Sequence, residues 1–380
     1  MNWTPLWRQA HTAGMPLGFK SGKKKTIAFE LPVYISGDRI RVVFLNHFGK
    51  KSCEVGSIVL KINGVLYPVT KNGKPSIKMP AGSRIISDEI KVKIHENTQM
   101  EVRIYMNTGN ADSNMTEDSA LSHKGNLTML EELPKIEKPE QMVKTGEYYA
   151  VPAIEAIEVY HEKKTKVIAA FGDSLTAMNR WGKPLQKRLY DAYGDEFSFV
   201  NEGILGNCLT YEIPGLFQRA FGEKGIKRFD RDMEGIENLH TVIFALCSND
   251  IAFGDEKRKH FLNVDNCILE TKRMIEKMRS RNLRVVGMTI SPRFGQEKIE
   301  FTERMNNDRH IYNEWLLTCG LFDYVLDADA VVRDSDNPEW YDARYHLGDH
   351  LHPNDEGGRI IAEAFNLEKL TGQSIKSGML

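Results

Sequence analysis

The feature that most constrains the fold is a change of rhythm near residue 165. Beyond this point, continuous apolar runs alternate with amphipathic segments. We expect strands at 166–171, 197–203, 241–246, 283–290 and 324–329, and helices at 183–193, 261–281, 307–319 and 355–366. Continuously apolar strands that alternate with helices are typical of a parallel sheet covered on both faces. The sequence therefore predicts a three-layer, doubly wound α/β domain over residues 151–380.

The first third of the chain has a different pattern, made of short runs rich in β-branched and aromatic residues. These runs predict strands at 26–35, 39–48, 57–62, 65–70, 88–94 and 100–106. Asn63-Gly64 lies between two of them and predicts a type I′ hairpin. We expect residues 1–150 to form a β-sandwich domain of jelly-roll-like form, ending in an irregular connection at 107–150. A chain of 380 residues is long enough for two such domains.

Composition excludes several classes of function. The formal net charge is −1, so binding to nucleic acid has no electrostatic support. No apolar run is long enough to span a membrane. The five cysteines are widely spaced and form no CxxC pair, which favours free thiols in a reducing compartment. The N-terminal segment lacks the apolar region of a signal peptide, so we expect a cytoplasmic protein, or a secreted one if a targeting segment has been removed.

Polar residues that can take part in catalysis lie at the expected strand ends. The stretch VIAAFGDSLTAM at 167–178 places Ser174 just beyond a strand, and Asp349 stands three residues before His352. Ligands of parallel sheets bind beyond the carboxyl ends of the strands. Serine, histidine and aspartate are the groups that nucleophilic acyl transfer needs, because the histidine accepts the serine proton and the aspartate orients the histidine. This chemistry requires neither a metal nor an organic cofactor.

Four ordered blocks carry a resemblance to a known family. They are GDSL at 172–175, NEGILGN at 201–207, CSND at 247–250 and DHLH at 349–352. Over roughly 165–370 the chain resembles the SGNH, or GDSL, hydrolases. The segments NRW at 179–181, KRFDRD at 227–232, HPNDEGG at 352–358 and GDRIRVVFLNHFG at 37–49 look like a bacterial esterase- or lipase-like subgroup with an N-terminal β-domain.

The resemblance implies a role for each matching residue. Ser174 would be the nucleophile, and His352 and Asp349 would complete the triad. The oxyanion hole would be formed by the backbone N–H groups of Ser174 and Gly206 and by the side chain of Asn249. Three further residues would support these groups: Asp173, Asn201 and Asp250. For Asn201, shaping the turn after its strand is an equally good interpretation.

Two points in these blocks leave alternatives open. Cys247 stands where the family usually has glycine, which puts the local backbone and the placement of Asn249 in question. His346 and His350 compete with His352 for the role of base, although the D-x-x-H spacing favours His352. The run HLGDHLH at 346–352 also has residue types that bind zinc. We favour the triad, because no second cluster of ligands accompanies this run.

From the residues and the resemblance together, we expect the activity to be hydrolysis of an ester through an acyl-enzyme. We expect a carbohydrate substrate, an O-acetylated oligosaccharide, because a β-sandwich precedes the catalytic domain and no long apolar lid-like segment is present. Short-chain carboxylesterase or lysophospholipase activity is the alternative. A hypothesis of another class is a carbohydrate-binding protein on a decayed hydrolase scaffold, with Cys247 as the sign of decay. The sequence contains no signal for an oligomeric state.

Overall fold

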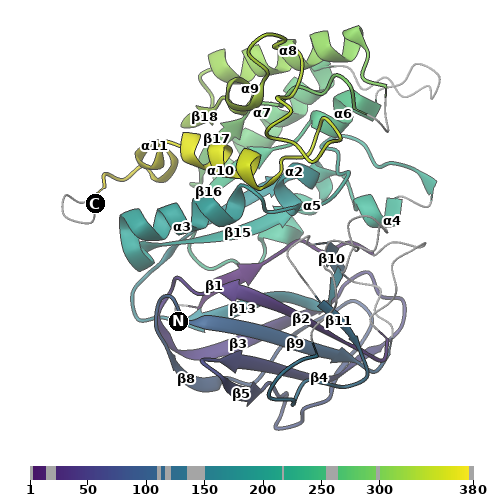
Figure 1. Ribbon diagram of the computed structural model, residues 1–380, viewed down its shortest axis with the longest axis vertical. Helices are drawn as coiled ribbons and strands as arrows, with labels where there is room; N and C mark the ends of the chain where they lie inside the picture. The colour runs from purple at the N-terminus through teal and green to yellow at the C-terminus, as the bar shows by residue number, and fades with distance from the viewer. Residues whose placement is uncertain are drawn as a thin grey trace. The chain divides into compact units, whose positions relative to one another are not determined.

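The computed structural model describes residues 3–13, 23–108, 113–115, 121–134, 150–215, 218–253, 264–296 and 300–375 (Figure 1). The chain divides into two compact units, which are described separately below. The first consists of Met1–Thr165 with Pro214–Gly222, and the second of Lys166–Ile213 with Glu223–Leu380.

The first unit is built from antiparallel strands. One sheet contains β1 (Trp3–Arg8), β13 (Ile154–Tyr160), β3 (Gly37–Asn46), β7 (Ser83–Ile86) and β8 (Ile90–Ile94). The other contains β11 (Leu121–Lys124), β2 (Lys25–Pro32), β9 (Gln99–Met106), β4 (Cys53–Ile62), β5 (Val65–Pro68) and β6 (Ile77–Met79). Strands β10 (Ser113–Met115) and β12 (Ala150–Pro152) pair with each other. A short helix, α4 (Gln218–Phe221), also belongs to this unit.

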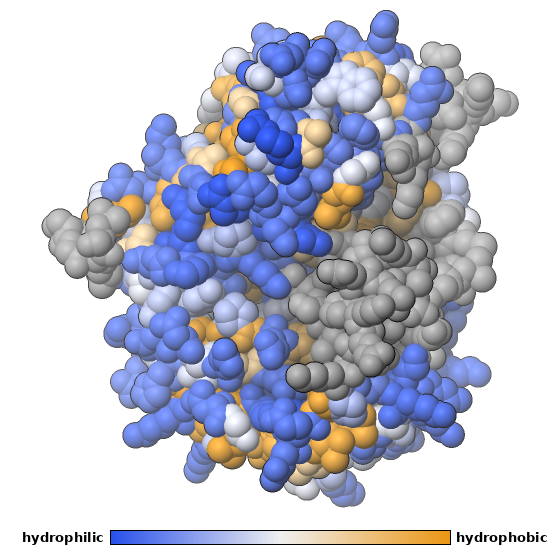
Figure 2. Space-filling view, viewed as in Figure 1, coloured by the Kyte–Doolittle hydropathy of each residue, from blue (hydrophilic) through white to orange (hydrophobic). Residues whose placement is uncertain are grey.

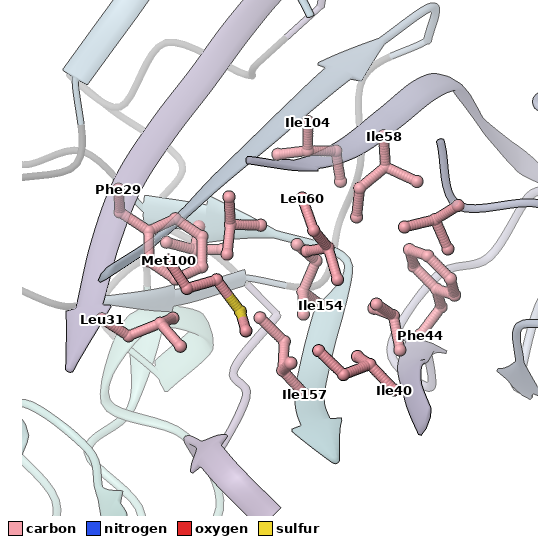
Figure 3. Close-up of a cluster of buried hydrophobic side chains, with 14 of the residues drawn as sticks. Phe29, Leu31, Ile40, Phe44, Ile58, Leu60, Met100, Ile104, Ile154 and Ile157 are labelled. Atoms are coloured by element: carbon pink, nitrogen blue, oxygen red, sulfur yellow. The ribbon is translucent and has the colours of Figure 1, made fainter. Parts of the chain in front are cut away.

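The two larger sheets share one apolar core, as expected for a β-sandwich. Figure 3 shows side chains of both sheets meeting in this core, from β2, β4 and β9 on one side and from β3 and β13 on the other. Residues i and i+2 of a strand point to the same face, which explains pairs such as Ile58 and Leu60. The predicted hairpin at Asn63-Gly64 is confirmed, since β4 and β5 pair as Ile62 with Val65 and both turn residues have positive φ.

The second unit contains a five-stranded parallel sheet. Its strands lie in the order β15 (Phe197–Gly203), β14 (Lys166–Gly172), β16 (Leu239–Ala245), β17 (Arg284–Met288) and β18 (Tyr324–Leu326). Within this unit the chain first forms β14, then forms β15 on one side of it, and then crosses over to form β16 on the other side. The carboxyl end of β14 is therefore the topological switch point, where ligands of such sheets bind.

Helices cover both faces of this sheet. One apolar core packs against α5 (Gly225–Met233), α6 (Ser248–Phe253), α7 (Val264–Ser280) and α8 (Glu303–Thr318). The other packs against α3 (Gly182–Tyr193), α9 (Ala328–Val332), α10 (Asp355–Ala364) and α11 (Leu367–Thr371). Alternate residues of β14 serve the two cores, with Val167 and Phe171 on one face and Ile168 on the other. A single turn, α2 (Ser174–Ala177), and a 3₁₀ turn at Gly194–Glu196 complete the unit.

The structure agrees with the predicted fold class, a three-layer α/β unit that follows an antiparallel β-rich region. It differs at residues 151–165, which the sequence analysis placed in the second domain. Strand β13 lies there and pairs with β1 and β3 of the first unit. Most of the predicted connection at 107–150 lies outside the described residues.

The described helices and the visible surface can be compared with what a membrane span requires. In the described ranges, no helix is long and apolar enough to cross a membrane. Figure 2 shows hydrophilic residues over most of the described part of the visible face, with apolar residues in small groups. Scattered apolar residues of this kind are normal on protein surfaces.

Candidate active site

Ser174 lies at the switch point of the sheet, two residues beyond the end of β14. Asp173 caps helix α2 by accepting a hydrogen bond from the backbone N–H of Leu175 at 3.0 Å. Gly172 has no room for a side chain, because a Cβ there would lie 2.1 Å from Oγ1 of Thr176. This tight exit from the strand presents Ser174 at the carboxyl edge of the sheet.

A continuous hydrogen-bonded chain joins Ser174 to two residues of the segment before α10. Nε2 of His352 lies 3.0 Å from Oγ of Ser174. Nδ1 of the same ring lies 2.6 Å from Oδ2 of Asp349. The other carboxylate oxygen, Oδ1, accepts the backbone N–H groups of Leu351 and His352 at 3.1 and 3.0 Å. The structure thus brings together the three residues that the sequence analysis predicted as a triad.

The environment of Asp349 favours the carboxylate form. Burial acts to raise its pKa, but the hydrogen bond from the His352 ring, the charge of that ring and the two backbone N–H groups outweigh burial. The pKa of Asp349 is lowered to about 2. Asp349 is therefore ionised at any pH near neutrality and accepts the Nδ1–H of His352, which leaves Nε2 as the acceptor that faces the serine hydroxyl.

The two competing histidines take other positions. The ring of His350 packs on the ring of His346, with 4.5 Å between centroids, and against Trp340 at 5.5 Å. Nδ1 of His350 is buried without a hydrogen-bond partner among the described residues. Nδ1 of His346 accepts backbone N–H groups of its own loop. Only His352, of these three histidines, has a hydrogen bond to Ser174 in the described structure.

The predicted oxyanion donors lie on the neighbouring strand ends. Gly206 has φ +66° in the turn after β15. Asn249 lies in the first turn of α6, and its Nδ2 donates to the backbone oxygen of Asn207 at 3.1 Å and to Oδ2 of Asp173 at 3.4 Å. In the parts of the chain that are described, the backbone N–H groups of Ser174 and Gly206 form no hydrogen bond. The two contacts of the Asn249 side chain hold it beside Asp173, the residue that precedes the serine.

Asn201 and Asp250 hold these segments together. Asn201 donates from Nδ2 to the backbone oxygen of Thr176 at 2.7 Å and accepts the N–H of Gly203 at 2.9 Å, which ties the end of β15 to helix α2. Asp250 accepts the backbone N–H groups of Leu209 and Thr210 at 2.7 and 2.8 Å. Burial raises the pKa of Asp250, and these hydrogen bonds act against burial. Both side chains are buried and contact protein, as a supporting role requires.

The arrangement of histidines offers little to a metal. Among the residues that the structure describes, no group of three or more His, Cys, Asp and Glu side chains has an arrangement that could hold a metal ion. The residues of the run at 346–352, all of them described, belong to no such group. His346 and His350 turn their rings toward each other instead.

One family model matches the part of the chain that contains all the candidate site residues. The model of the GDSL-like lipase/acylhydrolase family matches residues 170–360, half of the chain and all four sequence blocks. The chain belongs to the GDSL-like lipase/acylhydrolase family. It is a hydrolase that acts on ester bonds, and the resemblance predicted from the four blocks is confirmed.

The solved structures to which the chain is similar are distant in sequence. An acetyl xylan esterase is 22% identical, with a TM-score of 0.39, and the match covers 52% of this chain and 96% of that one. A carbohydrate acetylesterase family member from Sinorhizobium meliloti is 16% identical (TM-score 0.42; 55% and 100% covered). A GDSL-like lipase from Bacteroides thetaiotaomicron is 13% identical (TM-score 0.41; 55% and 89% covered). The search of curated proteins found no match.

Cys247, which replaces the usual glycine of the family, has a left-handed backbone conformation and a buried side chain. Cys247 has φ +82°, in the left-handed region that favours glycine. Its side chain is fully buried, and Sγ lies 3.7 Å from Oγ1 of Thr271. The thiol thus points into the core, and Asn249 is still held next to Asp173. A second thiol near the site, Cys208, is also buried, and burial raises its pKa well above the ordinary value, so it is a poor nucleophile.

Arg228 is a buried residue of the site that the sequence analysis did not single out. Its guanidinium donates to the backbone oxygens of Gly172 and Glu202 at 2.8 and 2.9 Å, to Oδ1 of Asn207 at 2.9 Å and to Asp232 at 2.6 Å. One side chain therefore holds the carboxyl ends of β14 and β15 and the predicted oxyanion turn. The spacing of Arg228 and Asp232 on a helix was the available signal, because residues four apart face each other.

Arg293, in the segment after β17, is a second such residue. It is 1% exposed and donates from Nη1 to the backbone oxygen and to Oγ of Ser248, at 2.8 and 2.7 Å. Burial lowers the pKa of Arg293 to about 10, with the charges of Asp173 and Asp349 acting in the other direction. The side chain fixes the residue before Asn249. No sequence pattern marks it, because its partners come from a different strand end.

Proposed function

We propose that the chain is a serine esterase with Ser174 as nucleophile. The observation that carries this proposal is the hydrogen-bonded chain from Asp349 through His352 to Ser174, with separations of 2.6 and 3.0 Å. His352 takes the hydroxyl proton while Oγ attacks the ester carbonyl carbon. The tetrahedral intermediate then collapses, and the alcohol leaves with the proton that His352 returns. Asp349 holds the ring and stabilises its charged form.

The second half of the cycle repeats these steps with water. His352 accepts a proton from water, whose oxygen attacks the acyl carbon of the acyl-enzyme. Collapse of the second tetrahedral intermediate releases the carboxylic acid and returns the proton from His352 to Oγ of Ser174. The protein supplies every group that these steps need.

Three donors would stabilise the oxyanion in both steps. Backbone N–H groups of Ser174 and Gly206 are two of them, and neither is used within the described structure. Asn249 is the third. Its bond to Asn207 is of ordinary length at 3.1 Å, whereas its contact with Asp173 is long at 3.4 Å. The hydrogen that faces Asp173 is therefore the one available to the oxyanion.

For the substrate we propose an O-acetylated saccharide. Trp340 supports this choice: it is 42% exposed, and its ring packs against those of His350 and Phe294. The backbone at Gly295 lies so close that a Cβ there would be 2.3 Å from the indole. Trp340 is thus a fixed, partly open aromatic surface on the segment that leads to His352. An aromatic ring with one open part suits the apolar face of a sugar.

The direct test compares substrates and variants in one panel. Acetylated xylo-, manno- and pectic oligosaccharides are assayed beside p-nitrophenyl esters of increasing acyl length. We expect the highest kcat/KM on one of the acetylated oligosaccharides, and Ser174→Ala should lower turnover of every substrate by about 10³-fold or more. Trp340→Ala should raise KM for the oligosaccharides but not for p-nitrophenyl acetate, while Trp340→Phe retains a ring and serves as the matched control.

Three results would argue against these proposals. Unchanged turnover in Ser174→Ala would refute the serine mechanism. A preference for long acyl chains would replace the saccharide with a lipid ester as substrate. An equal effect of Trp340→Ala on oligosaccharides and on p-nitrophenyl acetate would remove Trp340 from the binding of the sugar.

A further inference from the structure

The loop between Tyr345 and Asn354 carries both Asp349 and His352. Two side chains, the first that of Asp349 and the second that of His346, accept hydrogen bonds from its backbone. The N–H groups of Leu351 and His352 bond to Oδ1 of Asp349. The loop is closed at its base by backbone hydrogen bonds, from the N–H of Leu347 to the oxygen of His352 and from the N–H of Asn354 to the oxygen of Tyr345, both at 2.9 Å.

The second of these side chains is His346. Its Nδ1 accepts the backbone N–H of Gly348 at 2.9 Å and the backbone N–H of His350 at 3.2 Å. Gly348 and His350 are the residues on either side of Asp349. One nitrogen of one ring therefore holds the Leu347–Gly348 peptide, one residue before Asp349, and the Asp349–His350 peptide, directly after it.

This loop needs such a restraint, because its backbone is strained. Gly348 has φ +96° and His350 has φ +56°. At His350 this conformation is unfavourable, because in the left-handed region the Cβ of a residue other than glycine lies too close to the following carbonyl oxygen. Without the acceptor at Nδ1, the N–H groups of Gly348 and of the half-buried His350 would also lose their protein partner. The conformation that aims Asp349 at His352 thus depends on contacts, rather than on local preference.

The bonding pattern fixes the protonation state of His346. A nitrogen that accepts two hydrogen bonds carries no proton, so the ring is neutral and its proton is on Nε2. His346 is buried, and burial lowers its pKa, as does the neighbouring His350. Asp349 and Asp342 act in the opposite direction, and the hydroxyl of Tyr341, whose ring packs edge-on against His346, is neutral.

We propose that His346 is a positioning residue of the esterase, which holds Gly348 and His350 through its unprotonated Nδ1 and thereby fixes Asp349 against His352. The inference rests on the proposed function, because it explains how the acid of that triad is placed. Protonation of Nδ1 would remove both hydrogen bonds at once. Acidification should therefore impair the site in two ways, by charging His352 and by releasing the loop that His346 holds.

A matched pair of variants separates the acceptor from the ring. In His346→Asn, Oδ1 is attached to Cγ as Nδ1 is in histidine, so it can accept the same two N–H groups, but it cannot take up a proton near neutral pH. In His346→Leu the acceptor is lost and a side chain of similar bulk remains. Both variants are assayed with p-nitrophenyl acetate from pH 5 to pH 8, beside the native protein and Ser174→Ala, and thermal unfolding is recorded for each.

At pH 8 we expect His346→Leu to lower kcat by about tenfold to a hundredfold with little change in KM, since a displaced catalytic group affects the chemical step. His346→Asn should retain kcat within about threefold. On the acid side, native kcat/KM should fall by more than one decade per pH unit, because two groups protonate. In His346→Asn the fall should be about one decade per unit, as for a single group.

The outcomes decide between the two proposals. If Ser174→Ala is inactive while His346→Leu has native kcat, the serine mechanism stands and the role of His346 is refuted. If His346→Asn is as impaired as His346→Leu, acceptance by Nδ1 is not what matters, and the inference fails. If His346→Leu does not fold, the activity and acid slope of His346→Asn still decide the question. Full activity in Ser174→Ala would refute the proposed function itself.

Discussion

Among the residues other than glycine that the structure describes, Cys247 has the largest positive φ. At φ +82° a residue with a Cβ is strained, and the family usually has glycine at this position. Its neighbour Asn249 nevertheless keeps its contacts with Asn207 and Asp173. The departure therefore affects stability more directly than it affects the geometry of the site, which argues against a decayed hydrolase.

This interpretation predicts an inverted order of stability for two small substitutions. Cys247→Gly and Cys247→Ala both remove the thiol, so their difference isolates the backbone. Alanine usually stabilises a chain relative to glycine, but here the left-handed conformation costs roughly 1–2 kcal/mol. We expect the glycine variant to be more stable by about 0.5–1 kcal/mol in urea unfolding. A more stable alanine variant would show that the conformation at Cys247 carries no strain.

The titration of Asp173 should make the free energy of unfolding depend on pH. Burial raises its pKa to about 6, against the hydrogen bond from Leu175 and the charges of Arg293 and His352. Because the folded value exceeds the ordinary value of 3.8, the folded state binds the proton more tightly. The stabilisation is complete below about pH 3.8 and is lost as the pH rises through about 6.

Asp173→Asn removes this titration and keeps an oxygen that can cap helix α2. We expect the variant to gain stability relative to the native protein as the pH rises from 4 to 7, by up to about 3 kcal/mol. Urea unfolding of both proteins at several pH values measures the difference. A difference that is constant over this range would mean that Asp173 titrates normally.

The roles of individual residues were only partly predictable from the sequence. The D-x-x-H spacing favours His352 over His350 as the base, and His352 is the one of the two whose ring lies beside Oγ of Ser174 in the structure. His346 could not be assigned in this way. Its Nδ1 meets two N–H groups only because Gly348 and His350 adopt left-handed conformations, and neither conformation is encoded by a periodic pattern.

At the scale of elements, the geometry of the site depends on how the ends of the strands are held together. Arg228 on α5 reaches the ends of β14 and β15 and the turn that contains Gly206 and Asn207. A buried guanidinium with several acceptors is costly to remove, because those acceptors then lose their donor. The site is therefore tied to the folding of the strands that carry it.

We predict that Arg228→Met lowers the free energy of unfolding by about 3–5 kcal/mol and also lowers kcat. Arg273→Met is the matched control, since Arg273 pairs with Glu270 on the exposed surface of α7 and should change stability by less than about 1 kcal/mol. Equal effects of the two substitutions in urea unfolding would contradict the account of Arg228.

The long periodic elements were predicted from the sequence, whereas β1, β13 and α5 were missed. Long periodic segments such as the helix predicted at 261–281, observed at Val264–Ser280, are recognisable because apolar spacing reflects burial directly. The short strands β6 and β7 were missed, since three or four residues carry too little pattern. Arg293 was missed for a different reason, as its partner Ser248 lies 45 residues away and meets it only in the folded sheet.

At the scale of the whole molecule, the change of rhythm near residue 165 correctly separated two kinds of architecture. The antiparallel unit has one core between two sheets, and the parallel unit has a core on each face of its sheet. The exact boundary between the two units could not be predicted, because β13 pairs with β1, which lies near the N-terminus. Pairing between strands so far apart in the chain leaves no local trace in the sequence.

The most direct test of the central claim is covalent labelling of the intact protein with a fluorophosphonate, followed by mass spectrometry of the peptides. A fluorophosphonate reacts with a serine only when a neighbouring base activates it. We predict one label per chain, located on Ser174, and no label after substitution of His352 by alanine. A protein that binds acetylated oligosaccharides without being labelled, or one labelled at a different serine, would contradict the assignment of Ser174 as the nucleophile.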